Sequence, residues 1–461
     1  MTPQSRIRFE TAWLPEGWRN SVVVAIDAAG SIAAVNADDT ATPATLVKGA
    51  AIPGMPNVHS HAFQRAMAGL AERRASSSDS FWTWRETMYE LAGRMTPAAL
   101  NAIATQLYTE MLKAGYTSVC EFHYLHHAAL QQAGDAADSD AMLMSQALID
   151  AATSAGIGLT LLPTLYQTSE FGGAAPTARQ RQFTLSTERF IDLVQRLRAV
   201  PHSSQLEIGI ALHSLRAVPP DAMREVLASQ GGSGVVHIHV AEQQREVAAS
   251  LQHLGRRPIE WLLDHAVVDQ RWCLVHATHA TADELAAIAH CGAVVALCPT
   301  TEGNLGDGHF PLPEYLRAGG RFSIGSDSQV TLAPCEELRW LEYQARLRRQ
   351  ERNVCTGSDG SSVGANLWRS ACVAGAQVSG RNIGELKIGA RADIVVIDTD
   401  TPLFCNRTAD AIIDTFVFAG GASVVRDVMV GGRWLVHGGA HFAETAIAAG
   451  YKRAVHLLRT G

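Results

Sequence analysis

The feature that most constrains the fold of this 461-residue chain is a regular alternation of short apolar segments with helix-like segments between about residues 53 and 380. Eight apolar segments are predicted to be strands: the run that ends at His59, and residues 118–122, 158–163, 206–212, 234–240, 272–276, 293–298 and 321–327. Helix-like segments between them include residues 97–114, 139–155, 187–198, 219–229, 258–264 and 282–290. Eight such units predict an α/β fold, a closed parallel (β/α)8 TIM barrel, whose strands are buried on both faces. An open doubly wound sheet is the weaker alternative, because no glycine-rich phosphate turn follows the first strand.

The two ends of the chain have a different pattern. Residues 6–48 contain short pieces of alternating apolar and polar residues, such as 22–26 and 32–35, which are typical of a small β module. Short apolar segments return after Gly384 and are predicted to be strands: 394–397, 412–413, 416–418, 424–425 and 428–430. We predict that residues 1–49 and 384–440 form one composite β-sandwich, that 50–383 form the catalytic barrel, and that 441–461 form a helical tail. Residues 179–182 and 356–362 are expected to be polar loops.

Composition excludes several classes of partner. The net charge is −7 and no block rich in lysine and arginine occurs, so nucleic acid is not expected as a partner. No apolar run is long enough to cross a bilayer, and the first residues lack the apolar core of a signal peptide. The eight cysteines include no Cys-x-x-Cys pair, which argues against a disulfide framework or a thiolate zinc site. We therefore expect a cytoplasmic protein with reduced thiols and no membrane partner.

Two histidines stand one residue apart at the end of the first barrel strand, in the segment Pro53-Gly-Met-Pro-Asn-Val-His59-Ser-His61. Because side chains alternate in direction along a strand, His59 and His61 project to the same face. Two neighbouring imidazoles are half of a four-ligand metal site. About one such pair is expected by chance in a chain with 18 histidines, so the interpretation depends on the other strand ends.

Three later strands carry residues of the same kind at their carboxyl ends. His239 lies near the end of the fifth strand and Glu242 follows three residues later, while His276 ends the sixth strand and Asp327 ends the eighth. Working residues of such barrels lie at this end, so we expect this set to surround the histidine pair. The other histidines near strand ends are interpreted as structural: His123, His126, His127, His237 and His279.

The set predicts a Zn²⁺ site with an open position and four protein ligands: His59, His61, His239 and Asp327. Zinc lowers the pKa of a bound water to about 7, which makes hydroxide available at neutral pH. Asp327 and His276 are placed to accept or steer the proton of this water, and Glu242 is placed to carry a proton to a leaving nitrogen. The same ligands would accept Fe²⁺ or Mn²⁺.

These motifs, in this order, resemble the amidohydrolase superfamily. The resemblance covers nearly the whole chain and is carried by the segments ending at His61, His239-Val-Ala-Glu242, Val275-His276, Gly-Ser-Asp327 and Gly384-Glu-Leu-Lys-Ile-Gly-Ala-Arg-Ala-Asp-Ile-Val-Val-Ile-Asp398. It implies a metal-dependent hydrolase, usually a homodimer. The His-x-x-Glu pair resembles the mononuclear deaminase branch.

The distribution of lysines supports a single metal per chain. Binuclear members of the superfamily commonly bridge two metals with a carboxylated lysine from the fourth strand. No lysine occurs between Lys113 and Lys387, so that bridge cannot form in this chain.

Several polar residues near the same strand ends have no part in the predicted metal site: Gln64, Arg85, Tyr124, His213 and Arg216. Arg216 follows the fourth strand directly, and the planar guanidinium of arginine matches a carboxylate with two parallel hydrogen bonds. Two arginines together with a tyrosine and a glutamine suit a small dicarboxylate better than a flat nucleobase. We therefore predict that the substrate is a small dicarboxylate.

The segments His59-Ser-His-Ala-Phe-Gln-Arg65 and Phe122-His-Tyr-Leu-His-His127 resemble a group of amidohydrolases that act on a linear amidine. This resemblance implies hydrolysis of a formimidoyl C=N bond on an acidic amino acid with release of ammonia. It also implies which residues hold the carboxylates and the amidine end of the substrate: Gln64, Arg85, Tyr124, His213 and Arg216.

Two alternatives remain open. One is a deaminase or chlorohydrolase of an aminoheterocycle, such as guanine or a triazine, in the same superfamily. The other is a zinc-stabilised binding protein for acidic metabolites without turnover. Glu242 and His276 beside an open metal position argue against a pure binding protein, which needs neither residue.

Overall fold

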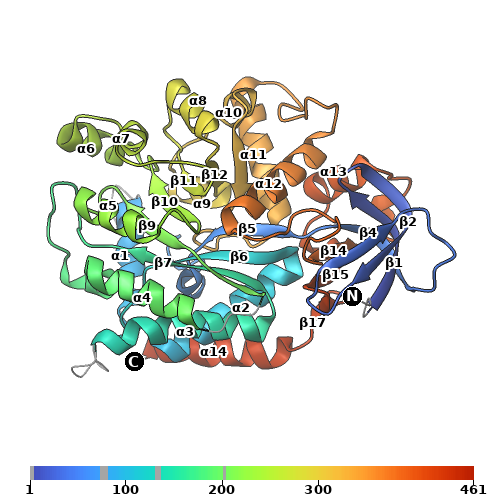
Figure 1. The fold of residues 1–461 in the computed structure, drawn as a ribbon, viewed down its shortest axis with the longest axis horizontal. Coiled ribbons are helices and arrows are strands. Elements are labelled where there is room, and N and C mark those ends of the chain that lie inside the picture. Colours follow the sequence, from blue (N-terminus) through green and yellow to red (C-terminus); the bar gives the residue numbers. More distant parts are fainter. Residues whose placement is uncertain (1–4, 73–80, 130–136, 201–203, 461) are drawn as a thin grey trace.

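The computed structural model describes residues 5–72, 81–129, 137–200 and 204–460, and it contains a barrel and a second sheet (Figure 1). The barrel is built from parallel strands enclosed by helices, and strands from both chain ends form the sheet beside it. The barrel strands are β5 (Met55–Ser60), β6 (Tyr116–His123), β7 (Gly158–Leu165), β8 (Leu206–Ile208), β9 (Ile210–Ser214), β10 (Val236–Val240), β11 (Trp272–His276), β12 (Val294–Leu297) and β13 (Arg321–Ile324). The predicted TIM barrel is confirmed, with the strand at 206–212 divided at Gly209 into β8 and β9.

The barrel is nearly closed, and its closure brings the first and last strand ends together. The strands follow the order β5-β6-β7-β9-β10-β11-β12-β13, with β8 paired to β7. Ser60 and Asp327 form a parallel bridge between the two edges of this sheet. The amide of Asp327 donates to the carbonyl of His59 at 3.0 Å, and the amide of His61 donates to the carbonyl of Asp327 at 3.2 Å. The backbone itself therefore places Asp327 beside the histidine pair.

Helices enclose the barrel, and several have the bounds that the sequence predicts. The helix α2 (Pro97–Ala114) begins after Thr96, whose side chain accepts a hydrogen bond from the amide of Ala99, and ends at Gly115, which has a left-handed conformation. The other predicted helices are α3 (Ala137–Ala155), α4 (Thr187–Ala199), α5 (Pro220–Ser229), α7 (Pro258–His265) and α8 (Ala282–Cys291). Helices not predicted from the sequence are α1 (Phe81–Ala92), α6 (Gln244–Leu254), α9 (Pro299–Leu305), α10 (Leu312–Arg317), α11 (Pro334–Arg349) and α12 (Val363–Ser379).

The second sheet combines both ends of the chain, as predicted. Its strands are β1 (Ser5–Leu14), β2 (Gly17–Ile26), β3 (Ile32–Asn36), β4 (Thr45–Pro53), β14 (Ile394–Ile397), β15 (Val425–Val430), β16 (Arg433–His437) and β17 (Ala440–His441). The antiparallel pairing of β4 with β14 joins the N-terminal strands to the C-terminal ones. This sheet has a core of its own, which includes Phe9, Val24 and Ile394. The domain boundaries stay a prediction, and β4 continues to Pro53, beyond the boundary expected at residue 49.

Two segments predicted as strands are helical. Residues 412–413 and 416–418 belong to α13 (Asp410–Phe418), so the prediction of strands there was wrong. Ile412, Ile413, Phe416 and Val417 are all buried, and their spacing places them on one side of a helix. The ring of Phe416 packs against Trp368 of α12 at 5.3 Å between centroids. Short apolar runs fit either a strand or a buried helix, and here packing against α12 decides.

Smaller corrections concern two other segments. The segment at 179–182, expected to be a polar loop, lies in the 3-10 helix η2 (Ala178–Phe183), where Gln180 and Gln182 are buried. Val424, expected to start a strand, ends a short 3-10 turn, and β15 begins at Val425. The segment 356–362 contains neither helix nor strand, as expected.

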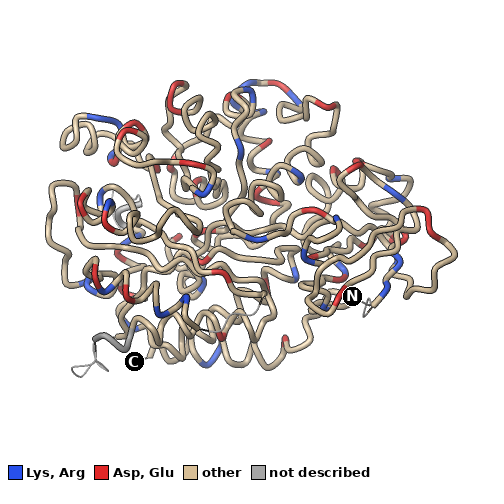
Figure 2. Tube along the Cα trace, viewed as in Figure 1, with Lys and Arg blue, Asp and Glu red and all other residues tan. Residues whose placement is uncertain are grey.

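The predicted helical tail is α14 (Glu444–Thr460), which runs along α2 on the outside of the barrel (Figure 1). Lys113 of α2 forms an ion pair with Glu444 at the start of this helix. Basic and acidic residues are interspersed over the outer helices and loops (Figure 2). Among the described residues, no helix is both long and apolar enough to span a membrane.

Candidate metal centre and active site

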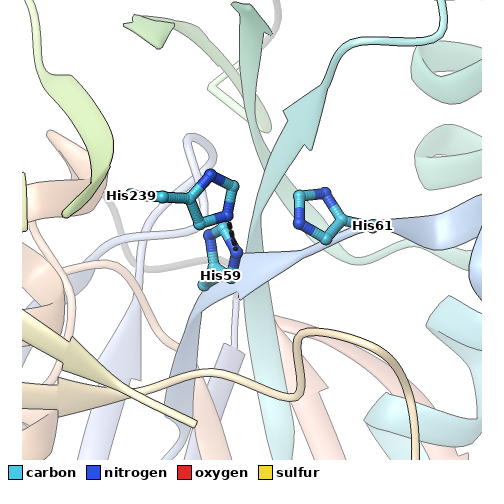
Figure 3. Close-up of side chains that lie close together, drawn as sticks. All are labelled: His59, His61 and His239. Atoms are coloured by element: carbon cyan, nitrogen blue, oxygen red, sulfur yellow. Dashed lines mark hydrogen bonds between the residues drawn. The ribbon is translucent and has the colours of Figure 1, made fainter. Parts of the chain in front are cut away.

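Three imidazoles meet at the carboxyl end of the barrel (Figure 3). His59 ends β5 together with Ser60, His61 follows directly, and His239 lies on β10. All three side chains are buried, and Figure 3 shows their rings close together. Nε2 of His59 lies 3.0 Å from Nε2 of His239.

Asp327 approaches the same point from the last strand. Its Oδ1 lies 3.5 Å from Nε2 of His59 and 3.4 Å from Nε2 of His61. In a tetrahedral zinc site with zinc–nitrogen bonds of about 2.0–2.1 Å, neighbouring ligand atoms lie roughly 3.3 Å apart. Each of these three separations is of that size, so each pair fits neighbouring ligands of one metal ion. The ligand atoms of His59, His61 and His239 form one group that could hold a metal, and those of His59, His276 and Asp327 form a second.

Hydrogen bonds on the outer side of two rings orient them for ligation. Nδ1 of His61 lies 3.0 Å from the carbonyl oxygen of Phe122, and Nδ1 of His239 lies 2.9 Å from that of His213. A carbonyl oxygen only accepts, so each Nδ1 carries the proton and each Nε2 presents a lone pair to the centre. Bonds of this kind fix the tautomer and the orientation of metal-binding histidines.

The electrostatics keep these groups in the protonation states that a metal requires. Burial lowers the pKa of His59 to about 3 and also lowers the pKa of His61 and His239, so the imidazoles are neutral. Burial by itself would raise the pKa of Asp327, but a hydrogen bond with His59 and the positive charge of His276 lower it below its ordinary value, so the carboxylate is ionised. Neutral imidazole and ionised carboxylate are the forms that bind metal ions.

Glu242 and His276 lie next to this centre. Nε2 of His276 is 3.8 Å from Oε1 of Glu242 and 3.7 Å from Oδ2 of Asp327. Burial raises the pKa of Glu242 to about 7. Burial would lower the pKa of His276, but the carboxylates of Glu242, Glu302 and Asp327 raise it to about 10. A carboxyl group with a pKa near neutrality is suited to accept and donate protons in turn.

Glu302 contacts the second ring nitrogen of His276, Nδ1. The sequence did not predict this residue. Its Oε1 lies 3.2 Å from Nδ1 of His276 and accepts a hydrogen bond from the amide of Cys298 at 3.0 Å. Glu302 belongs to α9, one strand further along the barrel. Nothing in the local pattern distinguishes it from a surface glutamate at a helix start.

One pocket is lined by all the predicted site residues except His59. The predicted metal and acid–base residues that line this pocket are His61, His239, Glu242, His276 and Asp327. The predicted substrate-binding residues that line it are Gln64, Arg85, Tyr124, His213 and Arg216. The tertiary structure therefore brings all these candidates together, although their roles stay a prediction.

Four of the five substrate-side residues make specific contacts. The amide of Gln64 donates to the hydroxyl of Tyr124 at 3.0 Å. Nη1 of Arg216 donates to the carbonyl oxygen of Ser169 at 2.9 Å, and this arginine is buried. The guanidinium of Arg85 lies over the ring of Tyr89 at 5.5 Å. These contacts fix the positive groups at the pocket wall before any ligand binds.

An aromatic part of the pocket wall was missed by the sequence reasoning. It consists of Trp84 and Tyr89 from α1, Tyr166 just after β7, and Phe183 from η2. Gln180 connects these elements, since its amide donates to the hydroxyls of Tyr166 at 2.7 Å and Tyr89 at 3.3 Å. Tyr166 could have been predicted to line the pocket because it directly follows a barrel strand. The short helix η2 has no sequence pattern that would predict its place at the pocket.

The histidines interpreted as structural, His123, His126, His127, His237 and His279, do not line the pocket. Nε2 of His126 pairs with the carbonyl of Thr164, and Nε2 of His127 pairs with that of Thr184. Their backbone amides both donate to the carbonyl of Gln182. The histidine-rich segment after β6 therefore holds the η2 loop against the barrel.

Comparison with known proteins establishes the class of this protein. The model of the amidohydrolase family matches residues 50–435. The chain therefore belongs to the amidohydrolase family.

Individual members of known sequence or structure are similar to nearly the whole chain. The formimidoylglutamate deiminase of Pseudomonas aeruginosa is 49% identical over 447 residues, which cover 97% of this chain and 98% of that protein. The crystal structure of an amidohydrolase from Brucella melitensis has a TM-score of 0.93 at 42% identity and covers 99% of this chain and 100% of its own. An adenosine deaminase from Xanthomonas campestris, solved with bound zinc, shares the fold with a TM-score of 0.81 at 22% identity, over 99% of this chain and 98% of that one.

Proposed function

We propose that this chain hydrolyses N-formimidoyl-L-glutamate to N-formyl-L-glutamate and ammonia. The observation that carries the proposal is a single pocket lined by two kinds of group. It combines His61, His239, Asp327 and Glu242 with the arginines Arg85 and Arg216. A linear amidine that carries two carboxylates matches both kinds of group. The identity of 49% with formimidoylglutamate deiminase supports the same substrate.

The proposed ligands of one Zn²⁺ per chain are His59, His61, His239 and Asp327. When bound, the metal supplies a Lewis acid that activates water at neutral pH. The proposed substrate contacts are Gln64, Arg85, Tyr124, His213 and Arg216. Arginine side chains in this pocket would hold the glutamate carboxylates through paired hydrogen bonds and so orient the formimidoyl carbon toward the acid–base residues.

The reaction requires two proton transfers to the terminal nitrogen. The water oxygen bonds to the carbon of the C=N group and the first water proton goes to the terminal nitrogen. The second proton then moves from this oxygen to the same nitrogen, the bond between carbon and the terminal nitrogen breaks, and ammonia leaves. Glu242 accepts a proton from the water and delivers it to the departing nitrogen. His276, held between Glu242, Asp327 and Glu302, stabilises negative charge that develops on the oxygen.

The test is ammonia release from N-formimidoyl-L-glutamate by protein of measured metal content, with and without a chelator. Rapid release at about one metal per chain, lost on chelation, is the expected result. Protein that carries one metal but releases no ammonia from this substrate refutes the proposal. Guanine and triazine derivatives, assayed alongside, test the alternative reading as a deaminase or chlorohydrolase of aminoheterocycles.

Three further features belong to the proposal. The chain acts in histidine degradation, in which a formimidoyl group arises from the opened imidazole ring, and it acts in the cytoplasm. It forms a homodimer, for which α11 offers an exposed apolar face with Trp340, Tyr343 and Leu347. Light scattering of the wild type and of a Leu347→Glu variant checks the last point, since a dimer through this face would dissociate in the variant.

A further inference from the structure

A second glutamate, Glu246, contacts the backbone of Glu242. Glu246 lies in the first turn of α6, is buried, and reaches the same pocket. Its Oε1 accepts a hydrogen bond from the amide of Ala241 at 3.1 Å, and its Oε2 accepts one from the amide of Glu242 at 3.0 Å. The two oxygens of one carboxylate therefore accept hydrogen bonds from two successive backbone amides.

These two peptide groups form an unusual turn. Ala241 has a φ of +52°, a left-handed conformation that residues other than glycine rarely adopt. The turn leads directly from the end of β10, which carries His239, to the residue that carries the proposed acid–base carboxylate. Because the direction of a side chain follows its backbone, the turn decides whether Glu242 points into the pocket.

The contacts of Glu246 are not those of an ordinary helix cap. The helix α6 follows Gln243, so the amides of Ala241 and Glu242 lie before the helix and are not among its own unpaired amides. Glu284 in the next unit is different, because it accepts a hydrogen bond from the amide of Thr281, the residue that caps its own helix α8. Glu284 does not line the pocket. It therefore provides a matched control.

We propose that Glu246 is a positioning residue of the reaction, which acts through Glu242 by holding the turn at Ala241. The inference rests on the proposed acid–base function of Glu242. Replacement of Glu246 should impair catalysis to the extent that Glu242 is displaced, and should leave substrate affinity and metal content nearly unchanged. In a protein that already lacks the Glu242 carboxylate, the same replacement should have little further effect.

The experiment is a double-mutant cycle with Glu246→Ala, Glu242→Gln and the combined variant, together with Glu246→Gln and the control Glu284→Ala. Glu246→Ala is expected to lower kcat by about 10- to 100-fold with KM within about threefold, since a shift of a catalytic group by 1 Å costs on that order. Glu246→Gln should be intermediate, because its amide has one acceptor oxygen for two donors. In the Glu242→Gln background, Glu246→Ala should change kcat by less than about twofold.

A second readout does not depend on activity. Hydrogen exchange at the amides of Ala241 and Glu242 should be slow in the wild type and faster in Glu246→Ala, while Glu284→Ala leaves it unchanged. Unchanged exchange in Glu246→Ala overturns the proposal. An equal loss of kcat in both backgrounds or a loss of metal from Glu246→Ala also overturns it. So does a rise in KM at constant kcat, which would assign Glu246 to substrate binding instead. Full activity of Glu242→Gln would instead refute the proposed acid–base role of Glu242. That outcome is distinct from a failure of the proposal for Glu246.

Discussion

The two pocket arginines lead to a prediction that tests substrate recognition directly. Arg216 is anchored by its hydrogen bond to Ser169, and Arg85 extends from α1 over the ring of Tyr89. Since they come from different elements and line one pocket, we expect each to bind one of the two carboxylates of the substrate. Arg216→Met and Arg85→Met remove the charge but keep an apolar stem of similar length.

The expected magnitude follows from the kind of bond that is lost. A hydrogen bond to a charged group contributes about 1.5–3 kcal/mol. Each tenfold change in rate corresponds to about 1.36 kcal/mol, so each variant should lose about 10- to 150-fold in kcat/KM for formimidoylglutamate. Metal content should stay at the wild-type value, because neither arginine belongs to the proposed set of metal ligands.

The assay combines variants with modified substrates. N-formimidoyl-glutamine lacks the charge of the side-chain carboxylate, and the corresponding isoglutamine derivative lacks that of the α-carboxylate. The wild type should discriminate against both, whereas each arginine variant should lose discrimination against one of them. If kcat/KM of both variants falls by the same factor with all three substrates, the arginines do not pair with the carboxylates and the reasoning is refuted.

Three other changes have defined outcomes. Glu242→Gln should retain one metal per chain while kcat falls by about 10²- to 10⁴-fold, and near-normal turnover with metal retained would contradict its role in proton transfer. Removal of the metal with a chelator should abolish ammonia release and lower the thermal unfolding temperature, and added Zn²⁺ should restore both, because a ligand of the folded state stabilises it; an unchanged unfolding temperature in metal-free protein speaks against the four-ligand site. Gln180→Leu removes two hydrogen bonds to Tyr89 and Tyr166, each contributing about 0.5–1.5 kcal/mol. Steady-state kinetics should show KM raised about 5- to 150-fold at nearly constant kcat; an unchanged KM would show that this link does not shape the pocket.

Much of the site could be predicted from the sequence because the order of strands along the chain determines their positions around the barrel. Strand ends that are far apart along the chain lie at one face, so His59, His239, His276 and Asp327 could be placed together once eight strands were counted. The same rule placed Arg216 and Tyr124 in the pocket, and it would have found Tyr166. Each of these residues follows a periodic apolar segment, and such segments are the strongest signal in a sequence.

The residues that were missed depend on contacts between segments without such a pattern. Trp84, Tyr89 and Phe183 reach the pocket from α1 and η2, whose positions follow from links such as Gln180 and the amides of His126 and His127. The helix α13 was mistaken for strands because its apolar residues fit either structure until Trp368 packs against them.

The barrel, the association of both chain ends and the set of possible metal ligands follow from the sequence alone. The reason is that apolar periodicity and strand order are local properties with a direct geometric meaning. The orientation and support of those side chains depend on the tertiary fold. The approach of Asp327 to His59 across the barrel seam, the contact of Glu302 with His276 and the two bonds of Glu246 all join atoms whose distance is set by the packed fold.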